Sequence, residues 1–290
     1  MIELSFEGEA KQLPENWQEV KPHLLPVYLK KLFVEPETQQ TYHELLRLSL
    51  GYSSRRWRRF CKVYFSDKLS EETHEHNAEI LQFLLGRIAW MWSEPMKVKP
   101  FDFVRINGEI HLLPDPLLKT LTYGELTDAY IHMVAYVKQL EKGDKRLNLL
   151  LATICRPKPT DYAYQERFDW NGDEREPYNE HIAEKRAEAW EAVSFEKKIP
   201  ILLYFVSVLK ELMETYQIYD TEAETEGEEE YPGQGFIKNQ HLLAEKQIFG
   251  TMKQTRQANA HDVLLFLEES KKDEDFQEKC RLEAEKHAKR

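Results

Sequence analysis

The sequence predicts a mostly α fold, with bundle-like packing of helices and two short β-hairpins as a minor β component. Two observations lead to this prediction. Over most of the chain, apolar residues recur at steps of three and four, the period of a helix with one buried face. Alternation of apolar and polar residues is confined to two short stretches, residues 2–13 and 98–113. Each stretch contains a glycine near its centre, as is typical of a hairpin turn.

The strongest helical pattern runs from Thr122 to Pro157 and predicts two helices joined by a tight turn. The first has an apolar stripe made of Leu126, Tyr130, Met133, Val137 and Leu140. Thr122 and Glu125 have the spacing of a capping box, in which each side chain accepts the backbone N–H of the other residue. Gly143 and Asp144 separate the helices. The second helix has a stripe made of Leu147, Leu150, Leu151 and Ile154, and Pro157 ends it.

The N-terminal stretch predicts a hairpin followed by helices. Ile2, Leu4 and Phe6 alternate with polar residues, Gly8 supplies a turn, and Leu13 lies on the returning strand. Asn16 and Glu19 then mark a helix start. Further helices, each bounded by Pro, Gly or Ser, are predicted at Leu24–Phe33, Thr38–Leu50, Ser53–Tyr64 and Ser70–Trp92.

Asn107-Gly108 marks the second hairpin, within residues 98–113. The dipeptide readily adopts the positive φ angles of a type I′ turn, and apolar residues alternate on both sides of it. A two-stranded ribbon is only marginally stable alone. We therefore expect this hairpin to pair with the N-terminal hairpin or with a partner protein.

The remaining chain predicts a loop, further helices and a linker. Lys158–Tyr178 is rich in Pro, Asp, Tyr and Gly and indicates an irregular loop. Helices are predicted at Glu180–Val193, Ile199–Tyr219, Phe236–Phe249 and Asn259–Glu268, with an exposed charged helix from Lys271 to Arg290. The acidic run Asp220–Glu230 contains almost nothing that can be buried. We therefore expect a main helical domain over residues 1–219, an acidic linker over 220–235 and a C-terminal helical segment over 236–290.

Composition and charge exclude several classes of protein. The net charge is -11, which disfavours general binding to nucleic acids or anionic membranes. The three cysteines, Cys61, Cys155 and Cys280, lie far apart and indicate a reducing compartment. Glutamates at the N-terminus do not fit a signal peptide. The longest apolar block, Ile199–Leu209, is too short for a membrane span, so no membrane partner is expected.

The most basic cluster is Arg55, Arg56, Trp57, Arg58 and Arg59. It is the candidate interaction patch of the chain. In one interpretation the arginines hold phosphates while Trp57 stacks on a base. In the other, Arg55, Arg58 and Arg59 share the solvated face of a helix while Trp57 and Phe60 face inward. We favour the second interpretation, because one patch on an acidic chain steers nucleic acid weakly.

No motif predicts a catalytic, cofactor-binding or metal site, and no cofactor is expected. His74 and His76 point to opposite sides of a helix, so only Glu72 and His76 share a face. Asp169, Asn171 and Asp173 suggest a calcium loop. However, Gly172 is the fourth residue of that run, whereas the EF-hand loop requires glycine as its sixth residue. Gly233-Gln234-Gly235 lacks both the preceding strand and the third glycine of a dinucleotide site. We expect a protein that is not an enzyme, although a site assembled only in three dimensions is the remaining alternative.

Several segments together resemble one group of proteins. The stretch Leu13-Pro14-Glu15-Asn16-Trp17-Gln18-Glu19-Val20, after a short strand pair, resembles the start of phage tail-assembly proteins. The order of later segments is similar too: Leu121–Leu126, Ala152–Pro157, Ile201–Leu209, Phe249-Gly250 and Asn259–Glu268. This arrangement resembles proteins encoded in tail or structural modules of phages and prophages of Bacteroidota-type bacteria.

The resemblance implies a non-catalytic tail-assembly or virion structural protein. Its partners would be other phage tail or virion proteins, or a second copy of itself. It would act through protein–protein contacts, in the host cytoplasm during assembly or in the virion. The alternative from another class is a nucleic-acid-binding module that uses the Arg55–Arg59 patch.

Overall fold

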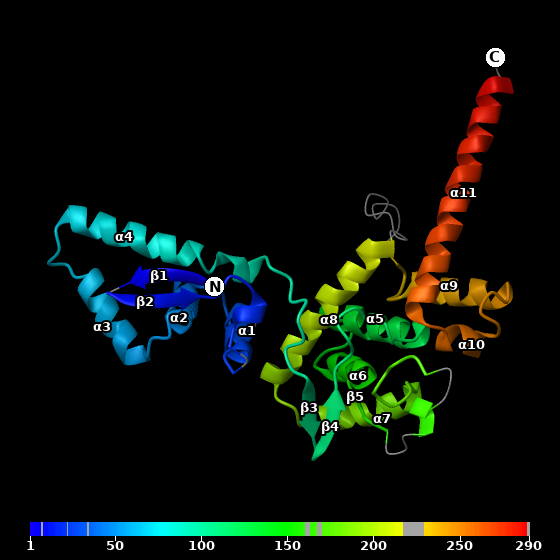
Figure 1. Ribbon diagram of the computed structural model, residues 1–290, viewed down its shortest axis with the longest axis horizontal. Helices are drawn as coiled ribbons and strands as arrows, with labels where there is room; N and C mark the ends of the chain where they lie inside the picture. The colour runs from blue at the N-terminus through cyan, green and yellow to red at the C-terminus, as the bar shows by residue number, and fades with distance from the viewer. Residues whose placement is uncertain are drawn as a thin grey trace. The chain divides into compact units, whose positions relative to one another are not determined.

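A computed structural model describes residues 1–6, 8–21, 23–33, 35–159, 163–166, 170–216 and 229–288. These residues fall into two compact units, whose elements are labelled in Figure 1. Unit 1 comprises Met1–Pro100 and Phe195–Leu203; unit 2 comprises Phe101–Ser194 and Tyr204–Arg290. Most described residues are helical, and they include one two-stranded and one three-stranded antiparallel sheet. The predicted mostly α fold with two short hairpins is therefore confirmed.

Unit 1 begins with the predicted hairpin and continues with helices. Strands β1 (Ile2–Phe6) and β2 (Glu9–Leu13) pair antiparallel, and Gly8 has a φ of 74°. The elements that follow are η1 (Trp17–Glu19), α1 (Leu25–Phe33), α2 (Gln39–Ser49), α3 (Ser54–Tyr64), α4 (Glu71–Gly86) and η2 (Ala89–Trp92). Thr38, Ser53 and Ser70 cap α2, α3 and α4, because each hydroxyl accepts a backbone N–H of the first turn.

Two tryptophans hold the N-terminal segment of unit 1 against η2 and the residues just after it. Trp17 Nε1 donates to the carbonyl of Glu94 at 2.8 Å, and Trp90 Nε1 donates to that of Pro14 at 2.7 Å. Their rings meet edge to face, with centroids 4.9 Å apart. Each indole thus buries a large apolar surface while its N–H group has a hydrogen-bond acceptor. The two indoles therefore link segments that lie more than seventy residues apart.

Unit 2 begins with the second hairpin. Strands β3 (Phe103–Ile106) and β4 (Glu109–Leu112) pair antiparallel across Asn107 and Gly108, whose φ angles are 48° and 89°. This is the predicted turn. The predicted pairing with the N-terminal hairpin is wrong, because β1 and β2 form a separate sheet, while the expected pairing with a partner protein stays a prediction. Strand β4 pairs instead with β5 (Arg156–Pro157), so the hairpin gains its third strand from the chain just after a helix.

The helices of unit 2 pack around α5 (Tyr123–Val137). The others are α6 (Lys145–Ile154), α7 (Glu180–Trp190), α9 (Gln234–Glu245), α10 (Met252–Gln257) and α11 (Ala260–Ala288), with η3 (Ala163–Glu166) between β5 and α7. Helix α5 contacts α6, α10 and α11, while α6 contacts α7 on its other side. Helix α8 (Phe195–Tyr216) contributes its first nine residues to unit 1 and the rest to unit 2.

The predicted stripe of α6 is confirmed, because Leu147, Leu150, Leu151 and Ile154 are fully buried. The predicted stripe of α5 is only partly correct. Leu126 is fully buried, but Val137 and Leu140 are 63% and 60% exposed. Helix α5 ends at Val137, and Gln139 has a φ of 49°. Leu140 therefore lies beyond the helix and does not continue its buried face.

Most of the predicted linker, residues 220–235, lies outside the described residues, which resume at Glu229. The carboxylate of Glu229 accepts hydrogen bonds from the backbone N–H groups of Gly233 and Gly235. It therefore satisfies donors at the start of α9. The predicted C-terminal segment, residues 236–290, contributes α10 and α11, which pack on α5 within unit 2.

Replacing a buried leucine of α6 by a carboxylate tests this packing. We expect Leu151→Asp to lower the free energy of unfolding by more than about 3 kcal/mol, because it buries an unpaired charge. The matched control is Leu140→Asp, whose side chain is 60% exposed, and it should cost less than about 1 kcal/mol. Chemical denaturation measures both values. Equal losses would show that α6 is not the core helix described above.

His132 on α5 makes the stability of unit 2 depend on pH. Burial, followed by the charge of Arg146, lowers its pKa from 6.5 to about 4. The unfolded chain therefore binds a proton that the folded protein resists, and stability falls as the pH drops from about 6.5 to about 4. Between about pH 7 and pH 5 the loss should be roughly 1–2 kcal/mol. Denaturation at several pH values should show a flatter profile for His132→Gln, whereas the exposed His181→Gln should follow the wild type.

Candidate functional site

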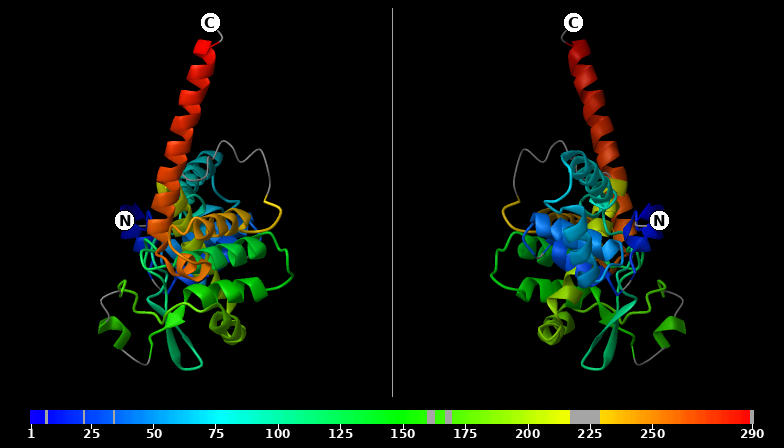
Figure 2. Two further views of the ribbon diagram at one scale, coloured as in Figure 1. Left: turned by 90° about the vertical axis from the view of Figure 1, so that its right-hand side faces the viewer. Right: turned by 90° about the vertical axis from the view of Figure 1, so that its left-hand side faces the viewer.

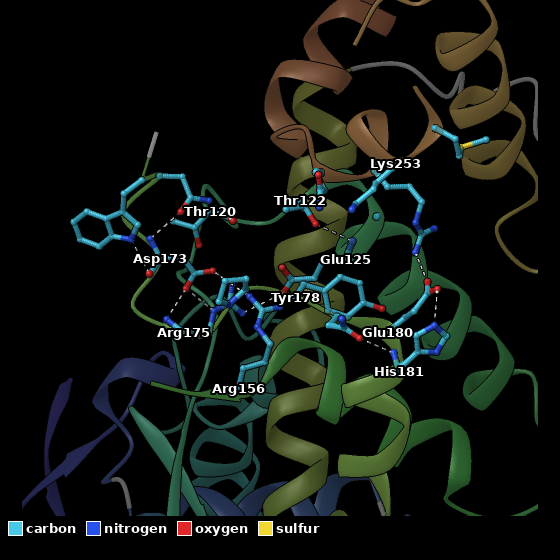
Figure 3. Close-up of a pocket in the computed structure, with 18 residues that line it drawn as sticks. Thr120, Thr122, Glu125, Arg156, Asp173, Arg175, Tyr178, Glu180, His181 and Lys253 are labelled. Carbon is cyan, nitrogen blue, oxygen red and sulfur yellow. Dashed lines mark hydrogen bonds and ion pairs between the residues drawn. The ribbon is translucent and has the colours of Figure 1, made fainter. Parts of the chain in front are cut away.

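Unit 2 contains a pocket of about 730 Å³ (Figure 3). Four segments, two of them consecutive in sequence, form most of its wall. They are the N-terminal end of α5, the loop from Trp170 to Tyr178, the N-terminal end of α7, and α10. Thr122 and Asn179 cap the two longer helices, each by accepting backbone N–H groups of the first turn. The N-terminal ends of α5 and α7, which are the positive ends of the two helix dipoles, therefore lie at the wall of the pocket.

Four charged side chains meet at the wall of the pocket (Figure 3). Glu125 Oε1 lies 2.7 Å from Arg156 Nη1 and 3.2 Å from Arg175 Nη1. Asp173 Oδ2 lies 2.7 Å from Arg175 Nη2 and 3.1 Å from Arg156 Nη2. Each carboxylate thus bridges the same two guanidinium groups. We call these four residues the charge cluster.

The charge cluster is almost completely removed from solvent. The side chains of Glu125, Arg156 and Arg175 are 1%, 3% and 2% exposed, and Asp173 is 13% exposed. Burial alone would raise the pKa of Asp173. Its hydrogen bonds with Arg175 and the charges of both arginines have the larger effect, so the pKa lies below its ordinary value. Burial lowers the pKa of Arg175, yet Glu125 and Asp173 raise it overall. The two positive charges therefore balance the two negative ones, as buried ions require.

A second set of polar contacts forms another side of the pocket. Arg256 Nη2 lies 2.6 Å from Asp128 Oδ2 and 2.9 Å from Glu180 Oε2. The Tyr178 hydroxyl donates to Asp128 at 2.6 Å, and burial followed by the Asp128 charge raises the pKa of Tyr178. A Cβ added to Gly124 would lie 3.0 Å from the carbonyl oxygen of Arg256, so glycine permits this close approach.

The charged side chains around the pocket are largely paired with one another. Lys253 is the exception, since no carboxylate of a described residue lies within ion-pair distance of it. His181 is 78% exposed at its side chain, and its ring nitrogens lie 3.8 and 3.9 Å from Glu180 and Glu184. Within the described part of the chain, no group of three or more His, Cys, Asp or Glu could hold a metal ion. The geometry favours a preorganised binding surface.

The sequence did not predict the charge cluster. Glu125 was expected to complete a capping box with Thr122; Thr122 does cap the helix, but the Glu125 carboxylate turns to the arginines. Asp173 was considered only as part of a calcium loop, which the position of Gly172 excluded. Each residue had a sufficient local explanation, while its actual partners lie up to fifty residues away. A single sequence carries no signal for such a pairing.

The Arg55–Arg59 patch lies on α3 in unit 1 (Figure 1). Its side chains divide as the favoured interpretation predicted. Trp57 and Phe60 are buried, at 6% and 3% exposure. Arg56 lies 3.0 Å from Glu9 and covers the ring of Tyr52 at 4.1 Å. Arg55, Arg58 and Arg59 are exposed. Two aromatic residues of this segment are therefore buried, one arginine is paired within unit 1, and three arginines face the solvent.

Comparisons with protein-family models, curated proteins and solved structures find no match to this chain. Across the part of the chain that the structure describes, no helix has both the length and the apolar character needed to cross a membrane. The site must therefore be judged on its own geometry.

The charge cluster can be tested through one carboxylate. We expect Glu125→Gln to lower the free energy of unfolding by roughly 3–5 kcal/mol, because it leaves two buried arginines with one negative charge. The matched control is Glu180→Gln, which removes a carboxylate that is 54% exposed at the rim and pairs with Arg256. The control should cost less than about 1 kcal/mol. Indistinguishable thermal melts of the two variants would contradict the role of the cluster.

Proposed function

We propose that the chain is a non-catalytic assembly or structural protein of a phage tail module, acting through protein–protein contacts. The observation that carries this proposal is the distal part of α11. All side chains from Lys272 to His287 are exposed, within a helix of 29 residues. In Figures 1 and 2 the last turns of α11 extend away from α5, α9 and α10.

The base of α11 is held firmly in unit 2. Val263 and Leu264 are fully buried, and the backbone N–H of Ala260 donates to Leu121 at 2.9 Å. His261 Nδ1 lies 2.7 Å from the hydroxyl of Tyr216, and its Nε2 lies 2.8 Å from the carbonyl of Leu117. The exposed turns therefore start from a fixed point, which supports a role in presenting a surface.

The exposed part of α11 is helical without tertiary packing among the described residues. Lys272 lies 3.0 Å from Glu268 and 2.8 Å from Glu269, and Arg281 lies 2.6 Å from Glu278. Such pairs each stabilise a helix by only about 0.2–0.5 kcal/mol. Phe276 and Leu282 remain 68% and 43% exposed. A partner that packs on these turns would bury apolar surface that the chain itself leaves in water.

The pocket of unit 2 supports the same proposal. Its charge cluster is balanced internally, and Arg256 is held by Asp128 and Glu180. Side chains matched to one another in this way fix a surface and leave few groups for proton transfer. A non-catalytic role accounts for the arrangement without a reaction.

A nucleic-acid-binding module is the second candidate, because exposed arginines share one face of α3. Trp57 argues against it, since a buried indole cannot stack on a base. Arg56, paired with Glu9, is also partly neutralised. The patch retains too few free cations to make many phosphate contacts, and binding would weaken strongly with salt.

The proposal is tested in a phage or prophage that carries this gene. Deleting the gene should yield particles without complete tails by electron microscopy, and the full chain should restore them. A chain ending at Lys271 should keep its thermal stability within about 1 kcal/mol, because the removed turns are exposed, but should not restore tails. The variant Lys238→Glu, at an exposed site on α9, is the control and should restore them.

Two results would contradict the proposal. Normal tails without the gene would exclude a role in the tail. Normal tails combined with heads that lack DNA would instead support the nucleic-acid alternative.

A further inference from the structure

The outward face of α3 carries four cations in one line. Arg55, Arg58, Arg59 and Lys62 stand at i, i+3, i+4 and i+7, and all four are exposed. Residues with this spacing share one face of a helix. At 1.5 Å per residue the line is about 10 Å long. We call these four residues the basic stripe.

The basic stripe has no acidic partner among the described residues. No described carboxylate lies within 4.0 Å of its charged nitrogens; the one contact recorded for them joins Arg58 Nε to the carbonyl of Ser54 at 3.4 Å. Neighbouring Arg56, by contrast, is paired with Glu9. Four unpaired cations on two helical turns stand out in a chain whose net charge is -11.

The stripe rests on a fixed support. The rings of Trp57 and Phe60 lie 5.0 Å apart, and Phe60 and Tyr64 lie 4.3 Å apart, along the inner face of α3. The hydroxyl of Ser53 caps the helix. Val63, one turn beyond Arg59, is 59% exposed. The cations are therefore presented on a rigid helix beside an accessible apolar side chain.

We propose that the basic stripe is the docking surface for an acidic segment of a protein partner, in which an apolar side chain covers Val63. This inference rests on the proposed function, since it requires a protein that works through protein contacts. Charge complementarity identifies the occupant: carboxylates spaced along two helical turns can meet the four cations. Such charges steer association and set register, while the apolar contact adds affinity.

Nucleic acid fits the stripe less well. A line of about 10 Å meets roughly three phosphates of one strand, because each strand of duplex DNA carries one charge per about 3.4 Å. The only aromatic side chain within the patch, Trp57, is buried. Within the patch α3 offers neither an exposed aromatic ring for stacking nor an extended row of cations, so an acidic protein segment is the better match.

The test uses the full chain and three labelled probes in fluorescence anisotropy. One is a peptide of Glu-Glu-Leu-Glu repeats, the second replaces every Glu by Gln, and the third is a short DNA duplex. At about 0.05 M salt the protein should bind the Glu peptide more tightly than either other probe. Raising the salt to about 0.15 M should weaken that binding.

Charge reversal locates the binding surface. The double variant Arg55→Glu with Arg59→Glu should weaken binding of the Glu peptide at least about tenfold, because it places like charges opposite each other. The control, Lys238→Glu with Lys246→Glu, makes the same charge change at two exposed lysines of unit 2. It should change affinity by less than about twofold. If charge reversal prevents folding, Arg55→Gln with Arg59→Gln removes the charges instead.

Three results would overturn the inference: equal binding of the Glu and Gln peptides, equal weakening in the control, or tighter binding of DNA. Each leaves the α11 truncation experiment unaffected. If that truncation blocks tail formation while the Glu peptide is not bound, the docking surface is wrong and the proposed function stands. If tails form normally without the gene, the proposed function fails whatever the peptides show.

Discussion

The buried carboxylate of Glu125 is the point on which the arrangement of unit 2 depends. Glu125 lies in the first turn of α5, and its carboxylate forms ion pairs with Arg156 of β5 and Arg175 of the following loop. Arg156 belongs to the strand that completes the sheet of β3 and β4, and Arg175 also donates to the carbonyl of Ile154 at 2.6 Å. Removing any one of these charges would leave the other three with an unbalanced buried charge, which is costly. Helix, sheet and loop are therefore held together by one electrostatic constraint.

The charged residues of the chain serve two different purposes. In the charge cluster, arginines and carboxylates are buried and form ion pairs with each other, so their effect is to fix the chain. On α3 the cations of the basic stripe are exposed and have no described partner, so their charge is available to another molecule. For the arginines, which both sets contain, the difference lies in burial and geometry. Composition alone cannot separate them.

Local signals in the sequence predicted much of the fold. Thr38, Ser53 and Ser70 act as helix caps, and Asn107-Gly108 forms the turn of the second hairpin, because each effect is decided within four residues. The third strand was not predicted, since two residues after a helix carry no strand pattern of their own. The pocket could not be predicted for the same reason. Its wall joins Glu125 to Arg256, and only tertiary packing brings such distant segments together.

The contact between α5 and the start of α11 affects the order in which the chain folds. The backbone N–H of Tyr123 donates to Ala258 at 2.9 Å, and that of Ala260 donates to Leu121 at 2.9 Å, so the start of α5 is bound to residues far downstream. Unit 1 is likewise completed by Phe195–Leu203. During synthesis, α5 and α6 can form early because their contacts are local, but the long-range pairings must wait for the C-terminal third to emerge. A ribosome-bound chain that stops before Met252 lacks α10 and α11, and it therefore exposes apolar surface of α5 that these helices cover in the finished protein.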